Sequence, residues 1–81
     1  MTQDADVSLT LDLKGLNCPL PALRTGRALR RMAPGARLFV ECTDPMAAID
    51  VPHSAHENGG VLERRSEAGG VLSFLIRRAV P

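Results

Sequence analysis

The chain has 81 residues, the size of one small domain, and 44% of them are hydrophobic, enough for one packed core. A formal net charge of +1 gives no overall attraction to nucleic acid or anionic lipid, and two Phe residues without Trp or Tyr argue against modules that stack bases on aromatic side chains. Two cysteines are too few for a disulfide scaffold, and their spacing forms no metal-ligand cluster.

The N-terminal residues MTQDADV lack the basic start and apolar run of a signal peptide, and no apolar stretch is long enough to span a membrane. We therefore expect a soluble protein in the reducing environment of the cytoplasm. Residues 1–6 are polar, so we expect a disordered tail there and one domain over residues 7–81. Nothing in the sequence demands more than a monomer.

In the first half of the chain, alternating hydrophobicity predicts a half-buried strand over residues 7–13, VSLTLDL. The segment KGLNCPLP ends this strand, and helical spacing of apolar residues then predicts a helix from about residue 21 to residue 32. The apolar side of this helix consists of Ala22, Leu23, Gly26, Leu29, Met32 and Ala33. Gly26 weakens the helix by roughly 1 kcal/mol relative to Ala, and we expect it to allow close contact between helix and sheet.

The second half predicts a strand over residues 36–43 and two strands over residues 61–67 and 71–78, joined by a turn at residues 68–70. Between them, Asp44-Pro45 and Asp50-x-Pro52 each look like a helix start, with Asp as N-cap and Pro in the first turn. Because proline disrupts a helix interior, we expect a short turn over residues 45–49 and a separate helix from about Val51 to Asn58. The order β-α-β-α-β-β predicts an α+β fold, a two-layer α/β sandwich with two helices on one face of a four-stranded mixed sheet.

Cys18 follows the first strand, in GLNCPLP, at the expected N-terminus of the first helix. Pro19 and Pro21 suit the first helical turn and stiffen this corner, and Gly15 is most simply a turn residue. A helix N-terminus carries partial positive charge, so we expect a lowered pKa and a reactive thiolate that attacks electrophilic sulfur. The alternative is a small, inert hydrophobic residue, but rigid turn residues around the thiol favour the reactive interpretation.

The remaining candidates for cysteine chemistry are weaker. Cys42 alternates with Leu38 and Val40, which favours a place in the core, although the sequence leaves a redox partnership or disulfide with Cys18 open. His53 and His56 fall on or near the second helix, where a histidine is more often solvated than catalytic. Because no base is evident beside Cys18, we expect a carrier thiol whose partners supply the remaining chemistry.

Arg24, Arg27 and Arg31 have i, i+3, i+7 spacing and form a stripe along the first helix. This stripe is either a solvated face or a docking surface for an acidic partner, which electrostatic steering would favour. We expect no direct nucleic-acid binding, because phosphate contacts alone carry no base specificity.

These features resemble the TusA-like, or SirA-like, sulfur carrier family over almost the whole chain. The matching elements are LDLKGLNCPLP, ALRRMAPG, the strand leading into TDP, the following DVP, a glycine after the second helix, and FLIRR. The C-P-x-P element is the most specific, and TDP followed by D-[IV]-P supports it independently. The sequence departs from the family at Gly26, at HSAHENGG, which lacks the second-helix thiol often found there, and at Gly60, where the family often has His.

The resemblance implies the same β-α-β-α-β-β sandwich and a sulfurtransferase-type relay without a cofactor. Cys18 would accept sulfane sulfur as a persulfide from a cysteine desulfurase or another donor and pass it to a downstream acceptor protein. Destinations in the family include tRNA thiolation, molybdenum cofactor biosynthesis and sulfur oxidation. Two alternatives stay open: a non-catalytic interaction or regulatory module that docks through the arginine stripe, and a thiol–disulfide sensor, which would need an accessible Cys42.

Overall fold

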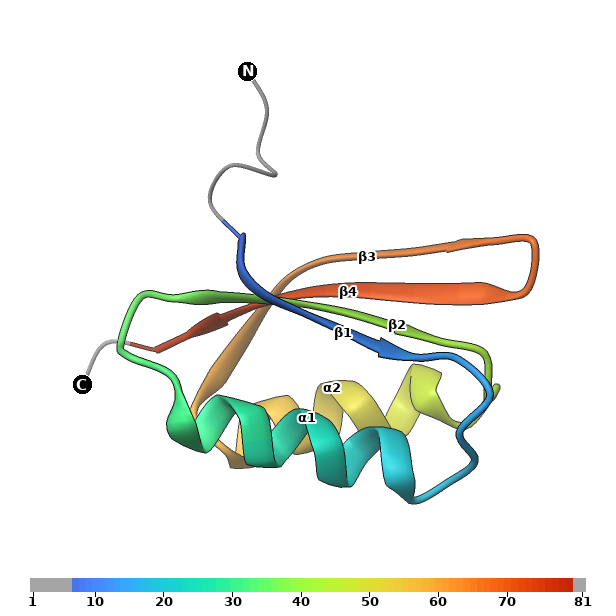
Figure 1. Cartoon of the computed structure of the whole chain (residues 1–81), viewed down its shortest axis with the longest axis horizontal. Helices are drawn as coiled ribbons and strands as arrows, with labels where there is room; N and C mark the ends of the chain where they lie inside the picture. The colour runs from blue at the N-terminus through green and yellow to red at the C-terminus, as the bar shows by residue number, and fades with distance from the viewer. Residues whose placement is uncertain (1–6, 80–81) are drawn as a thin grey trace.

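The computed structural model describes residues 7–79 as four strands and two helices in the predicted order (Figure 1). The elements are β1 (Val7–Leu13), α1 (Leu20–Arg31), β2 (Arg37–Cys42), α2 (Ala47–Glu57), β3 (Gly60–Ala68) and β4 (Val71–Arg78). Neither described helix has the length and apolar character needed to cross a membrane. The tail predicted for residues 1–6, and the last two residues of the domain predicted for residues 7–81, lie outside the described part of the chain.

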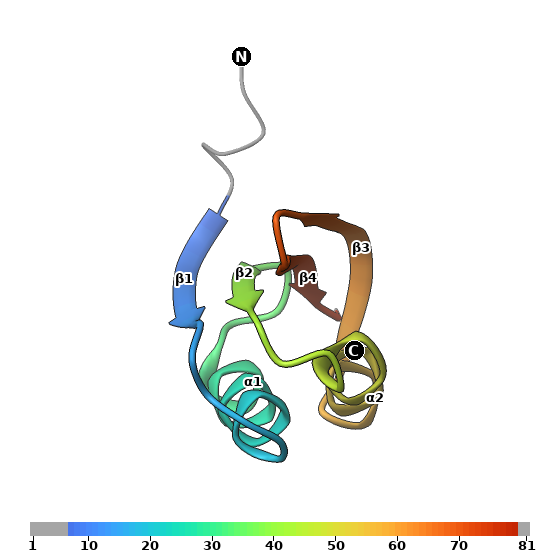
Figure 2. The same cartoon turned by 90° about the vertical axis from the view of Figure 1, so that its right-hand side faces the viewer.

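The four strands form one mixed sheet in the order β1-β2-β4-β3. β1 runs parallel to β2, whereas β4 is antiparallel to both of its neighbours. Both helices cover the same face of this sheet (Figures 1 and 2), which confirms the predicted two-layer α+β sandwich. Because β1 and β2 are parallel, their carboxyl ends meet at one edge of the sheet, where the chain then leads into α1 and α2.

The hydrophobic core fills the space between the sheet and the helices. Alternate residues of β2 and β4 point into it, and the helices supply apolar side chains that oppose them. The buried hydrophobic residues that form this core are Leu13, Leu29, Leu38, Val40, Cys42, Ala47, Val51, Ala55, Leu72, Phe74 and Ile76. The core position predicted for Cys42 is therefore confirmed, since none of its surface is exposed.

The edge strand β1 and the helix α1 are less buried than their hydrophobic patterns predict. Leu13 is the one fully buried residue of β1, and Leu9 remains 40% exposed because β1 has a neighbouring strand on one side only. Leu23, predicted on the apolar side of α1, is 61% exposed, because six helical residues place it about 120° around the axis from buried Leu29. Thr25 is buried instead, and its hydroxyl donates to the carbonyl of Pro21 at 2.8 Å.

The predicted break in the second helix is wrong, because α2 runs without interruption through Pro52. A proline at this position has no N–H for the carbonyl of residue 48, four positions earlier. The guanidinium of Arg65, on β3, donates a hydrogen bond to the Ala48 carbonyl at 3.2 Å and so replaces the missing partner. Sequence periodicity could not reveal this partner, which comes from another element.

Gly26 allows close contact between the two helices, and not between helix and sheet as predicted. A Cβ atom at Gly26 would lie 2.7 Å from Nδ2 of Asn58 and 2.9 Å from Oγ of Ser54, both on the α2 side of the contact. The Ser54 hydroxyl donates to the Ala22 carbonyl of α1 at 2.7 Å, and the Asn58 amide donates to the Ser54 carbonyl at 2.8 Å. The missing side chain of Gly26 therefore makes room for a polar link between α1 and α2.

Candidate functional site

Cys18 lies in the loop between β1 and α1, and its thiol is exposed and free of any disulfide. Two hydrogen bonds attach this loop to the segment that follows β2. The backbone N–H of Gly15, which has a φ of +87°, donates to Oγ1 of Thr43 at 2.9 Å, and the backbone N–H of Cys18 donates to Oδ2 of Asp44. The turn role predicted for Gly15 is confirmed, because such a φ favours glycine.

The two prolines shape the corner that follows the thiol. α1 begins at Leu20, so Pro19 occupies the position before the helix and Pro21 is its second residue. The two prolines have no backbone N–H. Two further N–H groups are occupied, since that of Leu20 donates to the Asn17 carbonyl at 2.9 Å and that of Leu23 donates to the Pro19 carbonyl at 3.1 Å. The start of α1 therefore directs few free N–H groups toward the Cys18 sulfur.

The thiol instead faces a carboxylate. Sγ of Cys18 donates to Oδ2 of Asp50, in the first turn of α2, at 3.1 Å. This hydrogen bond raises the pKa of the Cys18 thiol above its usual value, and desolvation and the negative charges of Asp50 and Asp44 act in the same direction. The prediction of a lowered pKa is wrong, because α2 and its preceding loop bring carboxylates to the site and one of them accepts the hydrogen bond of the thiol.

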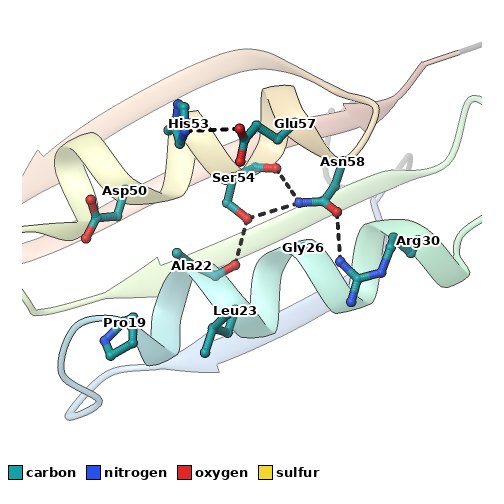
Figure 3. A pocket seen from close by; sticks show the side chains of 10 residues that line it. All are labelled: Pro19, Ala22, Leu23, Gly26, Arg30, Asp50, His53, Ser54, Glu57 and Asn58. Atoms are coloured by element: carbon teal, nitrogen blue, oxygen red, sulfur yellow. Dashed lines mark hydrogen bonds and ion pairs between the residues drawn. The ribbon is translucent and has the colours of Figure 1, made fainter.

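A groove with a volume of about 360 Å³ runs between α1 and α2 and begins at this carboxylate (Figure 3). Its lining residues are Pro19, Ala22, Leu23, Gly26, Arg30, Asp50, His53, Ser54, Glu57 and Asn58. Figure 3 shows Pro19 and Asp50 near one end and Arg30 near the other, where its guanidinium donates to the Asn58 side chain at 2.7 Å. The groove therefore begins at the carboxylate that accepts the hydrogen bond of the Cys18 thiol.

The histidines do not provide a base for Cys18. His53 pairs with Glu57 at 3.3 Å, and both side chains are mostly exposed, as the solvated interpretation predicts. His56 is exposed as well. Within residues 7–79, no group of three or more His, Cys, Asp or Glu residues could hold a metal ion.

Exposed apolar side chains lie on both of the segments that meet at the thiol. Most of the exposed large hydrophobic residues in the described chain lie on two segments, the start of α1 after Cys18 and the approach to Asp50. These residues are Leu20, Leu23, Met46 and Ile49. We call them the apolar rim. An exposed group of apolar side chains is typical of a protein-docking surface.

The structure brings the predicted arginine stripe together at a second groove, between β1 and α1. This groove has a volume of about 480 Å³ and an apolar floor. Its lining residues are Leu9, Leu11, Arg24, Arg27, Ala28, Arg31 and Met32. Among residues 7–79, Arg24, Arg27 and Arg31 pair with no acidic side chain. Neither Cys18 nor Asp50 lines this second groove.

Sequence reasoning missed the contacts of Thr43, Asp44 and Asp50 with the Cys18 loop, and took the two aspartates for helix caps. Asp44 does stabilise the turn before α2, since its side chain accepts from the N–H of Met46 at 3.1 Å. A usable signal was present, because parallel neighbouring strands place the segments after β1 and β2 at one edge of the sheet. The residues after Cys42 therefore had to lie near Cys18.

Comparison with known proteins shows the family of this chain. The family model described as sulfurtransferase TusA matches residues 9–78. The chain belongs to the TusA family. TusA relatives include the sulfur carrier protein TusA of Allochromatium vinosum, 41% identical over 93% of this chain and 99% of that protein. The sulfur carrier protein TusA of Pseudomonas aeruginosa is 36% identical over 96% of each chain.

A solved structure supports the TusA fold independently. The SirA-like protein of Desulfitobacterium hafniense superposes with a TM-score of 0.75, over 89% of this chain and 99% of that one. At 23% identity, this likeness shows the fold alone.

Proposed function

We propose that this protein is a sulfur carrier that accepts sulfane sulfur as a persulfide on Cys18 and relays it to an acceptor protein. The observation that carries the proposal is the exposed, free thiol of Cys18 on the C-P-x-P corner of a chain that belongs to the TusA family. Relatives that match this chain over nearly their whole length are named sulfur carrier proteins.

The surroundings of Cys18 suit transfer between proteins better than catalysis by this chain alone. The apolar rim offers a surface for a docked partner, and the exposed thiol where its two segments meet is accessible to a persulfide that the partner presents. Within residues 7–79 the hydrogen-bond partner of the thiol is the Asp50 carboxylate, and His53 is paired with Glu57, so no histidine assists the thiol. We infer that donor and acceptor proteins complete the reaction site on each side of the relay.

The arginine stripe supports a more specific proposal about the donor. We propose that Arg24, Arg27 and Arg31 hold an acidic segment of the donor protein, by family analogy a cysteine desulfurase, with an apolar side chain in the floor between β1 and α1. The unpaired positive charges and the apolar lining fit such a segment. The acceptor docks on the same apolar rim after the donor has left. A reducing cytoplasm suits this cycle, because the thiol must return to its free form.

Mass spectrometry tests the carrier. The protein is incubated with a cysteine desulfurase and cysteine, and intact masses are compared for wild type, Cys18→Ser and Cys42→Ser. We expect the mass of added sulfur in wild type and Cys42→Ser and none in Cys18→Ser. Added sulfur on Cys18→Ser would contradict the carrier proposal. A wild type that stays unmodified while still binding a partner through its arginines would contradict it as well and would favour the interaction module.

Charge reversal tests the docking surface. Arg27→Glu should slow loading from the protein donor by at least about threefold, because steering and docking weaken. Loading from a small-molecule persulfide should not change. Arg64→Glu, on β3 at the opposite edge of the sheet, is the matched control. Equal slowing by the Arg64 variant would mean that net charge, and not this groove, sets the rate.

A further inference from the structure

We propose that Asp50 controls the proton of the Cys18 thiol: it holds the sulfur protonated in the free protein and receives the proton when Cys18 attacks a donor persulfide. This role rests on the proposed carrier function and gives the site a residue that the C-P-x-P element does not contain. Asp50 contacts the reacting sulfur already in the free protein, so in this proposal it is a catalytic residue.

The geometry places the Asp50 carboxylate directly on the sulfur. Sγ of Cys18 and Oδ2 of Asp50 are 3.1 Å apart, although the two residues lie on different elements. Two contacts hold them in register: the Cys18 N–H donates to Asp44, before α2, and Ser54 of α2 donates to Ala22 of α1. The thiol and the carboxylate therefore face each other as part of the packing between α1 and α2.

The charges around the sulfur are negative on the α2 side and neutral on the α1 side. α2 and its preceding loop contribute Asp50 and Asp44, whereas the corner that begins α1 contributes prolines and leucines. The cation of the Cys18 loop, Lys14, is paired with Asp12 and Glu41, both at 3.2 Å. Within residues 7–79, no cationic side chain forms an ion pair with Asp44 or Asp50. A thiolate here would meet two uncompensated carboxylates, so the thiol form is favoured.

The transfer step then follows with a defined path for each atom. The Sγ–H bond of Cys18 breaks, its proton passes to Oδ2 of Asp50, and the sulfur electron pair attacks the terminal sulfur of the donor persulfide. A new Sγ–S bond forms while the donor S–S bond breaks. The electrons of the broken S–S bond leave on the donor cysteine sulfur, and this sulfur takes up the proton that Asp50 received. Cys18 sulfur is oxidised, the donor cysteine sulfur is reduced, and no other oxidant is needed.

Loading removes the hydrogen bond that holds Asp50. Sγ in the persulfide carries a second sulfur in place of its proton, so it no longer donates to Oδ2. Asp50 also lines the groove between α1 and α2, next to the rim. The Asp50 carboxylate at the mouth of this groove is therefore hydrogen-bonded to Cys18 in the unloaded protein and released from it in the loaded protein. Partners can distinguish the two forms by this difference.

The pH dependence of Cys18 alkylation tests the first part of the proposal without any sulfur donor. Asp50→Asn keeps the shape and an acceptor oxygen but removes the charge. We expect its alkylation rate, followed on the Cys18 peptide by mass spectrometry, to rise about threefold to tenfold at pH 7.5, with the whole profile displaced to lower pH. Glu57→Gln removes a carboxylate from the same helix and groove and should leave the profile unchanged. Circular dichroism checks that both variants are folded.

Loading from a persulfide donor tests the second part. Asn cannot receive the proton, so the loading rate of Asp50→Asn, divided by its alkylation rate, should fall at least about threefold below wild type. An Asp50→Asn alkylation profile that overlays wild type, or an equal displacement in Glu57→Gln, would overturn the holding role. An unchanged ratio would overturn the receiving role. Failure of wild type to load would instead reject the carrier function and leave the alkylation result standing.

Discussion

The two cysteines sit beside the same edge of the sheet, yet they have opposite surroundings. Cys42 is the last residue of β2 and pairs in register with Leu13, the last residue of β1. Cys18 comes five residues after that leucine, beyond a turn that lifts the chain out of the core. Burial raises the pKa of Cys42 to about 11, with the charge of Asp44 acting in the same direction, whereas the raised pKa of Cys18 comes first from its hydrogen bond to Asp50.

This difference shows that exposure separates the candidate carrier thiol from the structural one. Both thiols resist ionisation in the free protein. The main cause for Cys18 is a hydrogen bond that a docked partner or a single substitution can alter, whereas the main cause for Cys42 is core burial, which cannot be relieved without unfolding. The predictions that follow test this contrast, in order of decreasing expected effect.

The largest effect is expected in alkylation of the native protein. Cys18 should react in the folded state. Cys42 should react at least about a thousandfold more slowly, because its alkylation requires opening of the core. Peptide-level mass spectrometry over a time course measures both rates in one sample. Comparable labelling of the two peptides under native conditions would show that Cys42 is accessible and would revive the thiol–disulfide sensor.

Cys42 should make the fold sensitive to alkaline pH. Its pKa is higher in the folded protein than in the unfolded chain, so unfolding releases a proton, and the stability present below about pH 9 is lost as pH rises toward 11. We expect the free energy of unfolding to fall by about 2 kcal/mol over this range.

Urea unfolding at several pH values provides the measurement for this alkaline effect. Cys42→Ala serves as the control, because alanine cannot titrate and should show a flatter profile above pH 9. The same loss in wild type and Cys42→Ala would assign the alkaline sensitivity to other groups.

The contact between α1 and α2, which holds Asp50 against Cys18, should respond to Gly26→Ala. The added Cβ would crowd Asn58 and Ser54, so we expect a loss of about 1 kcal/mol even though alanine favours the helix. In a background with Ser54→Ala and Asn58→Ala the crowding is gone, and the same change should stabilise. Thermal unfolding of the two backgrounds, each with and without Gly26→Ala, gives the sign of the stability change in each. A gain in stability in both backgrounds would show that the helices do not meet closely at Gly26.

The smallest effect concerns an ion-pair network away from both cysteines. Arg37 donates to Glu63 at 2.7 Å and Arg77 donates to it at 2.9 Å, and Arg37 is the main cause of the lowered pKa of this carboxyl. A lowered pKa stabilises the fold above the ordinary pKa of glutamate, and this contribution is lost as pH falls through the folded value.

Glu63→Gln should therefore cost less than about 1 kcal/mol at neutral pH and leave Cys18 alkylation unchanged. Glu67→Gln, on the same strand, is the control for the loss of charge alone. An altered Cys18 rate in the Glu63 variant would mean that the site is coupled to the outer strands.

The sequence was sufficient for the element order and for the position of Cys18 between β1 and α1, because both follow from local patterns. Alternation in β1, β2 and β4 and the glycines of the hairpin turn each act within a few residues. What it did not predict depends on contacts between distant segments. The Arg65 hydrogen bond that completes α2 at Pro52, and the approach of Asn58 to Gly26, each join residues from separate elements.

The error about the acidity of Cys18 has the same origin. A helix N-terminus is a local feature, so the sequence predicted its effect on the thiol, but Asp50 lies 32 residues away and reaches the sulfur only through the packing of α2 on α1. Parallel pairing of β1 and β2 was inferable and would have placed the aspartates near the loop. The hydrogen bond itself depends on side-chain geometry that spacing does not encode.

The central claim is that one sulfur atom, that of Cys18, carries the transferred group. The most direct measurement digests the wild-type protein after incubation with a persulfide donor and compares the masses of the peptides that contain Cys18 and Cys42. We expect the additional sulfur on the Cys18 peptide alone, removable by a thiol reductant. Sulfur on the Cys42 peptide, or on neither, would contradict the account.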